Sequence, residues 1–201
     1  MIIETYPLGN IQANCYIVYK NNSALIIDPG TSSKRIVQRL QNKNINVEAI
    51  LLTHGHFDHI GGVDFFANVF SCDVYMHEKD FDFLQDPKLN ASSHHTPIRV
   101  SHKVLPLTST MSLGPFKFTI DNLAGHSNGS CFLIFDDIIF SGDILFKGAI
   151  GRYDLTGGSR NKMSASIEKI KMYDPSYTIY PGHGEATTLL LEFQNNPYFK
   201  R

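Results

Sequence analysis

The chain has 201 residues, a length typical of one domain. Hydrophobic residues make up 42% and charged residues 18%, which is typical of a globular protein and excludes a disordered one. The net charge is −1, and the terminal Lys200-Arg201 pair is too short to indicate nucleic-acid binding. No targeting segment is recognisable, and no run approaches the ~20 apolar residues of a membrane span. We therefore expect one domain over residues 1–201, cytoplasmic, with neither a nucleic-acid nor a membrane partner.

The first half of the chain alternates between apolar runs and one helical pattern. Residues 13–19 and 23–27 are apolar and β-rich, and Asp28-Pro29-Gly30 ends the second run as a turn. Residues 33–42 carry apolar side chains at helical spacing, which predicts a helix. Residues 47–52 form another apolar run that leads directly into a histidine-rich loop. Active sites of α/β folds lie at such strand ends, so we expect the site there.

The second half repeats this order of strands, helix and strand. The predicted elements are strands at 116–120, 130–135, 138–140 and 177–180, and helices at 164–172 and 185–194. Asp136-Asp137 is expected to form a hairpin turn. Residues 85–102 have the weakest periodicity and are expected to form a loop. Two similar halves therefore indicate two sheets packed face to face, with helices on the outside.

The segment from His54 to His59 carries most of the chemical signal. Side chains of an extended segment alternate, so His54 and His56 are expected on one side and Phe57 on the other, anchored in the core. Asp58 and His59 follow and can face a second ion. This segment predicts a metal site.

Three further candidate ligands occur singly at strand ends. His126, Asp143 and His183 each follow an apolar run, and each has a glycine on its N-terminal side. Imidazole and carboxylate ligands suit zinc, and also iron or manganese. Three histidines and a shared carboxylate leave an open position on a metal, as catalysis requires. Two ions roughly 3.5–4 Å apart could share a hydroxide and polarise a substrate oxygen.

Other residues have plainer interpretations. Asp28 either orients a ligand histidine or simply forms the turn before Pro29. His77 is interpreted as structural, His102 as solvated, and His94-His95 as loop residues that could alternatively line a substrate mouth. The cysteines lie far apart among apolar neighbours and are expected to be buried, reduced and structural: Cys15, Cys72 and Cys131.

The order and spacing of these candidate ligands resemble the metal-binding pattern of the metallo-β-lactamase superfamily. Its pattern is a His-x-His-x-Asp-His loop followed by single His, Asp and His ligands, and every position is matched here in the right order. The resemblance implies an α/β fold, the αβ/βα four-layer sandwich. It also implies two divalent metal ions, with zinc favoured. The implied ligand sets are His54, His56 and His126 for one ion, Asp58, His59 and His183 for the other, and Asp143 as the bridge.

Within the superfamily the chain is similar to glyoxalase II, the hydroxyacylglutathione hydrolases, and especially to their short bacterial members. The segments that carry this likeness are Gly142–Phe146, Gly151–Asp154 and Pro181–Thr188. The likeness implies that Arg152 contacts the thiol part of the substrate, where a cation suits a carboxylate. The alternative is a structural Arg152 paired with Asp154. The C-terminal helical region with which full-length glyoxalase II binds glutathione has no counterpart after His183 beyond one predicted helix.

The resulting prediction is a metal-dependent hydrolase of small 2-hydroxyacyl thioesters. A metal-activated hydroxide would attack the thioester carbonyl, and Asp58 would hold the second metal and orient the hydroxide. The alternative of the same fold is a persulfide dioxygenase. It would hold one iron with His54, His56 and Asp143, or with an equivalent set of ligands that includes His126. A β-lactamase is less favoured, since the subclass with a Cys ligand needs it where Asp143 stands. A non-catalytic metal-binding module predicts no thioesterase activity.

Overall fold

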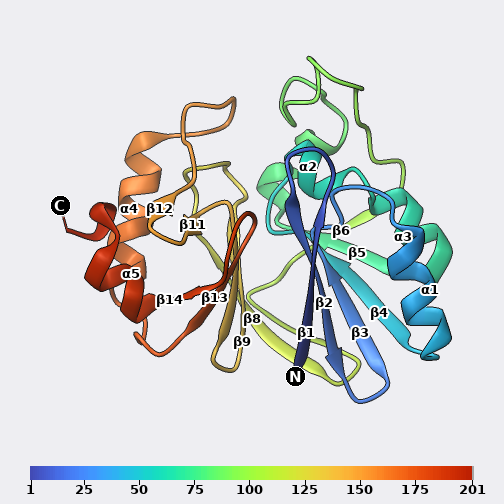
Figure 1. The fold of residues 1–201 in the computed structure, drawn as a ribbon. Coiled ribbons are helices and arrows are strands. Elements are labelled where there is room, and N and C mark those ends of the chain that lie inside the picture. The colour runs from blue at the N-terminus through green and yellow to red at the C-terminus, as the bar shows by residue number, and fades with distance from the viewer. Residues whose placement is uncertain (201) are drawn as a thin grey trace.

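Two β-sheets pack face to face at the centre of the molecule, and helices cover the outer face of each sheet (Figure 1). The structure is a computed structural model, and it describes residues 1–200. Figure 1 shows α1 (Lys34–Asn42) and α3 (Val63–Phe70) beside one sheet, and α4 (Arg160–Ile170) and α5 (Leu189–Asn195) beside the other. This arrangement confirms the predicted αβ/βα four-layer sandwich.

The first sheet is built by the N-terminal half in sequence order. Its strands are β1 (Ile2–Leu8), β2 (Ala13–Lys20), β3 (Ser23–Ile27), β4 (Asn46–Leu51), β5 (Asp73–Met76) and β6 (Val104–Pro106). The pairs β1–β2 and β2–β3 are antiparallel, whereas β3, β4, β5 and β6 run parallel. The carboxyl ends of the parallel strands therefore meet at one edge, and the loop after β4 begins there.

The second sheet is built by the C-terminal half in the order β14-β13-β10-β9-β8-β7. Its strands are β7 (Thr110–Leu113), β8 (Phe116–Asn122), β9 (Cys131–Phe135), β10 (Ile138–Gly142), β13 (Thr178–Pro181) and β14 (Thr187–Thr188). Strands β10 and β13 are parallel, so the segments that follow them leave the sheet on the same side. A separate hairpin of β11 (Leu145–Phe146) and β12 (Ala149–Ile150) follows β10.

Strand alternation sorts the apolar side chains into three layers. On β2, Cys15 and Ile17 face the helices of the first half, whereas Tyr16 and Val18 face the second sheet. The third layer lies between the second sheet and α4 and α5, and includes Ile139. A strand that is buried on both faces carries an unbroken apolar run, which is why the sequence of β2 predicts a strand so clearly.

Two short helices lie next to the histidine loop, namely α2 (Phe57–Ile60) and the 3₁₀ helix η1 (Glu78–Leu84). A second 3₁₀ helix, η2 (Pro197–Phe199), follows α5. Glycine permits the close packing here, because a Cβ at Gly30 would overlap the backbone carbonyl of Asp58. The turn after β3 therefore presses directly against α2.

Most predicted elements are confirmed, and the differences have local causes. Helix α5 begins at Leu189 and not at Glu185, because Thr187–Thr188 pair with β13 as strand β14. Helix α4 begins four residues before the predicted Ser164, where the Ser159 side chain accepts a hydrogen bond from the Lys162 amide. Strands β1, β5, β6 and β7 were not predicted. Residues 85–102 contain neither a helix nor a strand, as expected.

The predictions about cysteines and membranes have different outcomes. The cysteines are free and buried, as expected, and burial raises the pKa of the Cys15 thiol. Within residues 1–200, none of the helices has both the length and the apolar character needed to cross a bilayer. The cytoplasmic location stays a prediction.

Candidate metal centre

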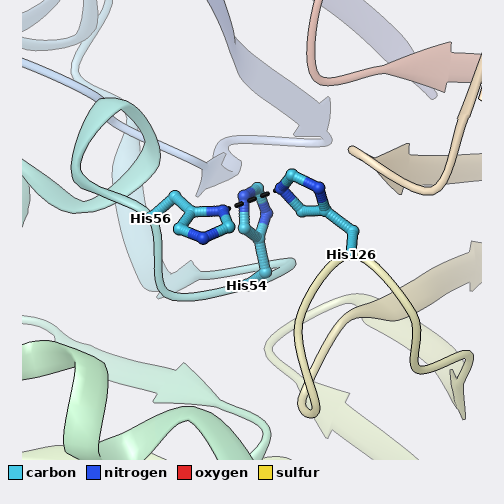
Figure 2. A group of neighbouring side chains, drawn as sticks. All are labelled: His54, His56 and His126. Atoms are coloured by element: carbon cyan, nitrogen blue, oxygen red, sulfur yellow. Dashed lines mark hydrogen bonds between the residues drawn. The ribbon is translucent and has the colours of Figure 1, made fainter. Parts of the chain in front are cut away.

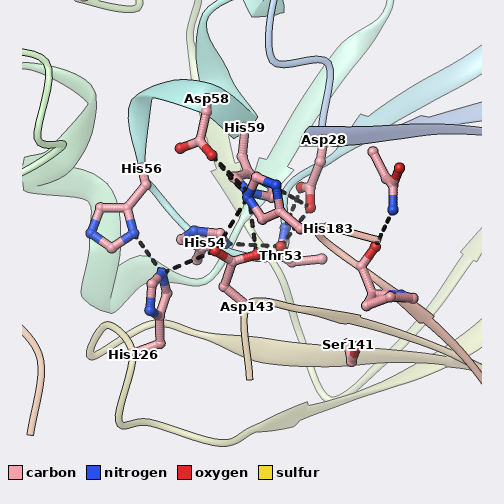
Figure 3. Close-up of polar contacts among 12 residues, drawn as sticks. Asp28, Thr53, His54, His56, Asp58, His59, His126, Ser141, Asp143 and His183 are labelled. Atoms are coloured by element: carbon pink, nitrogen blue, oxygen red, sulfur yellow. Dashed lines mark hydrogen bonds and ion pairs between the residues drawn. The ribbon is translucent and has the colours of Figure 1, made fainter. Parts of the chain in front are cut away.

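The predicted ligands come together at the edge where the two sheets meet (Figure 3). The loop after β4 and the start of α2 carry four of them, the β8–β9 connection carries His126, and Asp143 and His183 follow β10 and β13. The end of β13 is tied to the first sheet, since the Asn14 side-chain amide donates to the carbonyls of Pro181 (3.0 Å) and Gly184 (2.9 Å). Long-range contacts between the halves therefore set the position of His183.

The first donor group consists of His54, His56 and His126 (Figure 2). One ring nitrogen from each lies within 4.8 Å of the other two, and the residues are at most 3% exposed. The Nδ1 of His56 and the Nε2 of His126 are 2.7 Å apart. This group contains no carboxylate.

The second donor group consists of Asp58, His59 and His183, whose ligand atoms also lie within 4.8 Å of one another. The Oδ2 of Asp58 is 3.1 Å from the Nε2 of His183 and 3.5 Å from the Nε2 of His59. The His183 side chain is 28% exposed, whereas that of His59 is fully buried. This group is therefore the more open of the two.

Asp143 lies between the two groups. Its Oδ1 is 3.4 Å from the Nε2 of His59, and its Oδ2 is 3.6 Å from the Nε2 atoms of both His126 and His183. The glycine at 182 leaves room for this carboxylate, because a Cβ there would overlap the Oδ1 of Asp143. A carboxylate in this position can reach a cation in either group.

Asp28 and Thr53 fix the orientation of two ligand imidazoles. The carboxylate of Asp28 accepts hydrogen bonds from the amide (2.8 Å) and the hydroxyl (2.6 Å) of Thr53, and it lies 3.0 Å from the Nδ1 of His59. Because the Thr53 hydroxyl hydrogen points to Asp28, its oxygen accepts from the Nδ1–H of His54 (3.1 Å). Both histidines therefore turn a free Nε2 toward the centre. Asp28 itself is already engaged by these donors, so it orients ligands.

His126 is oriented by the backbone of the opposite loop. Its Nδ1–H donates to the carbonyl oxygen of Arg152 at 2.7 Å. The Nε2 of His126 is consequently the nitrogen with a lone pair, and it faces the Nδ1 of His56.

Several buried polar atoms of the centre have no hydrogen-bond partner within residues 1–200. The Nε2 of His54 is one of them, and the Nε2 of His59 and the Oδ1 of Asp143 approach each other only to 3.4 Å. A buried polar atom without a partner costs about 1–3 kcal/mol. Imidazole nitrogens and carboxylate oxygens that converge in this way fit divalent cations, which would satisfy these atoms.

The two groups have opposite electrostatic character. Burial and the neighbouring imidazoles hold the pKa of His54 well below its usual value, and burial with His126 lowers the pKa of His56 to about 3. Burial also opposes charge on His59, but Asp58, Asp143 and Asp28 outweigh it and raise the pKa of His59 well above its usual value. Burial would raise the pKa of Asp58, and His59 with His183 reverses this and lowers it.

A cavity of about 570 Å³ opens onto the centre. Its walls include Ile11, Phe57, Phe146, Arg152 and Leu155, and both His94 and His95 line it. The expectation that Phe57 anchors the loop in the core is wrong: its ring is half-buried, faces the cavity and lies 5.4 Å from the ring of His95. That expectation relied on the alternation of side chains along an extended segment, which stops at His56 because α2 begins at Phe57.

Arg152 has the pairing with Asp154 that was one of the two alternatives considered from the sequence, and its contact with a substrate stays a prediction. Its exposed guanidinium forms a two-pronged pair with Asp154, with 2.8 Å between Nε and Oδ1 and 2.9 Å between Nη2 and Oδ2. It also lines the cavity, so its charge is available at the mouth. No sequence pattern indicates the role of Thr53 or the apolar walls at Ile11 and Phe146, because these depend on contacts between distant segments.

A sequence profile of the Metallo-beta-lactamase superfamily matches residues 8–183. The chain belongs to this family. YqgX, a probable metallo-hydrolase of Bacillus subtilis, is 37% identical over 199 residues, which cover 96% of this chain and 94% of YqgX. The hydroxyacylglutathione hydrolase GloC of Haemophilus influenzae is 32% identical over 213 residues, which cover 98% of each chain.

Solved structures of family members superpose closely on this one. The BLEG-1 B3 metallo-beta-lactamase has a TM-score of 0.92 and 37% identity, with both chains covered completely. TTHA1623, crystallised in a di-iron-bound form, has a TM-score of 0.88 and 34% identity over 97% of this chain and 99% of its own. The family, its metallo-hydrolase members and the converging donor groups together support a metal-dependent hydrolase.

Proposed function

We propose that the protein hydrolyses small 2-hydroxyacyl thioesters in the manner of glyoxalase II, with two divalent cations in its active site. The observation that carries the proposal is the pair of donor groups that share Asp143 beside an open cavity. The similarity to a hydroxyacylglutathione hydrolase supports the substrate class. The proposed partner is a small-molecule thioester.

His54, His56 and His126 would hold one cation, and Asp58, His59 and His183 the other, with Asp143 shared. Bound divalent cations lower the pKa of a water ligand to about 7 and polarise a carbonyl oxygen. Zinc is the proposed metal, because imidazole with carboxylate suits it; iron and manganese suit the same donors. The di-iron form of a family member keeps iron in consideration.

Asp58 is the proposed catalytic carboxylate. It lines the cavity, and His59 and His183 keep its pKa low, so it is ionised at neutral pH. An ionised carboxylate at this place accepts a hydrogen bond from the attacking water and orients it toward the carbonyl carbon. The water oxygen then forms a C–O bond and gives up one proton, and the C–S bond breaks. The products are a carboxylic acid and a thiolate, and the released proton passes to the thiolate or to solvent.

The cavity walls suggest how the substrate lies. The apolar side chains of Ile11, Phe57 and Phe146 flank the centre, and the Arg152 guanidinium lies at the mouth. We propose that Arg152 contacts a carboxylate on the thiol part of the substrate, since guanidinium and carboxylate match in geometry. Its pairing with Asp154 holds the guanidinium in place for this contact.

The test is a thioesterase assay on S-lactoylglutathione and on thioesters of other thiol carriers, with metal content measured on the same sample. We expect hydrolysis of a 2-hydroxyacyl thioester and two cations per chain. One iron per chain, with oxygen uptake on a persulfide and no thioesterase activity, would instead establish the dioxygenase. Binding of cations without either activity would indicate a metal-binding module.

Hydrolysis of β-lactams is a second candidate, favoured by the close superposition on a B3 metallo-beta-lactamase. The two reactions share an attack of water on a carbonyl carbon and differ in the leaving group, because a β-lactam releases an amine that must gain a proton. A chromogenic cephalosporin assayed on the same sample separates them. The proposal predicts that kcat/KM for the best thioester exceeds that for the cephalosporin.

A further inference from the structure

We propose that Asp80 is a positioning residue that sets the geometry of His54, His56 and His126 by joining the two loops that carry them. Asp80 lies on η1, and its side chain is buried. It is not one of the candidate ligands. The inference rests on the two-cation site proposed above, and it concerns the first donor group alone.

The carboxylate of Asp80 accepts hydrogen bonds from both loops. Its Oδ2 accepts from the amide of Gly55 (3.1 Å) and from the hydroxyl of Ser127 (2.6 Å), and its Oδ1 accepts from the amide of Gly129 (2.6 Å). Burial raises the pKa of Asp80, and these donors oppose the rise. An ionised carboxylate is the side chain that can accept from several donors at once.

These donors adjoin the ligands of the first group. Gly55 lies between His54 and His56, and Ser127 directly follows His126. The two loops come from different sheets, so their relative position depends on what holds them together. Asp80 bonds to both, and it therefore fixes the spacing between the first two imidazoles and the third.

The Ser127 end of this connection is itself fixed. The hydroxyls of Ser127 and Ser130 are 2.6 Å apart, and the amide of Ser127 donates to the Ser130 hydroxyl (3.0 Å). Because the hydroxyl hydrogen of Ser127 points to Asp80, the Ser130 hydroxyl donates to Ser127. The loop after His126 is thus held by hydrogen bonds between Ser127 and Ser130, and the Ser127 hydroxyl connects this pair to Asp80.

Close packing against η1 supports the same role. A Cβ at Gly55 would lie 2.5 Å from the Cβ of Phe83, and a Cβ at Gly129 would lie 2.7 Å from the Cγ of Asp80. Both loops therefore touch η1 directly, and glycine permits that approach. Helix η1 is the surface against which the first donor group is assembled.

The second donor group is oriented by another carboxylate. His59 is held by Asp28, and none of the Asp80 hydrogen bonds reaches Asp58, His59 or His183. A change at Asp80 should therefore affect one cation and spare the other. A residue that only maintained the fold would affect both.

The substitution Asp80→Asn keeps the shape of the side chain and removes one acceptor. If the amide oxygen stays on the Gly129 amide, the new NH₂ group faces the Gly55 amide and the Ser127 hydroxyl. The hydroxyl can rotate and accept, but the Gly55 N–H loses its acceptor. The segment between His54 and His56 should then shift.

The experiment titrates the metal-free protein with Co²⁺, follows the absorption spectrum, and records thermal unfolding without metal. For Asp80→Asn we expect one binding step weakened by about 10–100-fold, an unchanged second step, and a melting temperature only a few degrees lower, because one buried donor loses its acceptor. Asp82→Asn, an exposed change on the same helix, should match the wild type. In an Asp58→Ala background, where the second group is lost, Asp80→Asn should weaken the one remaining step.

Unchanged Co²⁺ binding by Asp80→Asn would overturn the inference, as would equal weakening of both steps with a lower melting temperature. If Asp80→Asn does not fold, Ser127→Ala is the deciding variant, and we expect a smaller weakening of Co²⁺ binding at the first group alone. Equal weakening of both binding steps, or no change in either, would contradict the inference. A wild type that binds fewer than two cations would refute the proposed site itself, which separates that failure from failure of the role of Asp80.

Discussion

The two donor groups of the centre differ in charge and in access to solvent. The first has three imidazoles, is at most 3% exposed, and keeps the pKa values of His54 and His56 low. The second consists of Asp58, His59 and the partly exposed His183. The carboxylates around it raise the pKa values of both histidines. The first group is thus the more buried one and holds His54 and His56 against protonation, whereas the second is more exposed and contains a carboxylate.

Under the proposed function, this difference would give the two cations different roles. The more buried group would suit a cation that polarises the substrate carbonyl, because hydrogen bonds and burial fix the geometry of its ligands. An open group with a carboxylate suits the side at which water enters and is oriented. Three substitutions and a change of pH test this comparison and the proposed role of the cavity mouth.

The largest effect is expected for Asp58→Ala, which removes the carboxylate of the second group. We expect kcat for thioester hydrolysis to fall by about 10²–10⁴-fold, because the acceptor that orients water is lost. The cation content should fall from two to one, as measured by elemental analysis after dialysis. A variant that keeps both cations and full activity would show that Asp58 is neither a ligand nor catalytic.

Thr53→Val should affect both groups, in contrast to Asp80→Asn. The hydroxyl of Thr53 connects His54 of the first group with Asp28, which holds His59 of the second. Its loss should weaken both Co²⁺ binding steps by about 10–100-fold. Thr53→Ser keeps the hydroxyl and should bind Co²⁺ nearly as the wild type does. Weakening of only one binding step in Thr53→Val would contradict the connection of the two groups through Thr53 and Asp28.

Acid should weaken cation binding at the second group more than at the first. In the cation-free protein His59 and His183 have raised pKa values, so they carry protons that a cation must displace, and binding falls as the pH falls. His54 and His56 have lowered pKa values and are neutral above about pH 6. Co²⁺ titrations at about pH 8 and about pH 6 should therefore show one strongly and one weakly pH-dependent step; equal dependence would count against the contrast.

The smallest effect is expected for Arg152→Ala, at the mouth of the cavity. Its side chain is 60% exposed, and exposed ion pairs contribute about 0.2–1 kcal/mol, so KM for a carboxylate-bearing thioester should rise by about 1.4–5-fold while kcat changes little. Arg152→Lys keeps the charge and should lie between the two. An unchanged KM would leave Arg152 with its structural pairing to Asp154 alone.

The sequence predicts best those residues of the centre that lie close together in the chain or directly after a strand. His54, His56, Asp58 and His59 occur within six residues, and His126, Asp143 and His183 each follow a strand, so both the residues and their strand-end placement could be predicted. The structure brings all of them together as expected, and their role as ligands stays a prediction. The layers of the fold were predicted because both halves repeat the order of strands, helix and strand, and because the family resemblance implies a four-layer sandwich.

The parts that could not be predicted depend on contacts between distant segments. Asp80 lies in a run of charged and aromatic residues that is typical of an exposed helix, and only the packing of η1 against both loops buries it. Phe57 was misplaced because helix α2 begins at this residue, so the side-chain alternation of an extended segment no longer applies to it. Strands β5, β6 and β7 have only three or four residues, too few for periodicity to indicate them.

The most direct test of the account is a crystal structure of the protein loaded with zinc, with anomalous diffraction used to locate the ions. We predict two anomalous peaks per chain, one among His54, His56 and His126 and one among Asp58, His59 and His183, with Asp143 between them. A single peak, or a peak at residues outside these two groups, would contradict the two-cation centre.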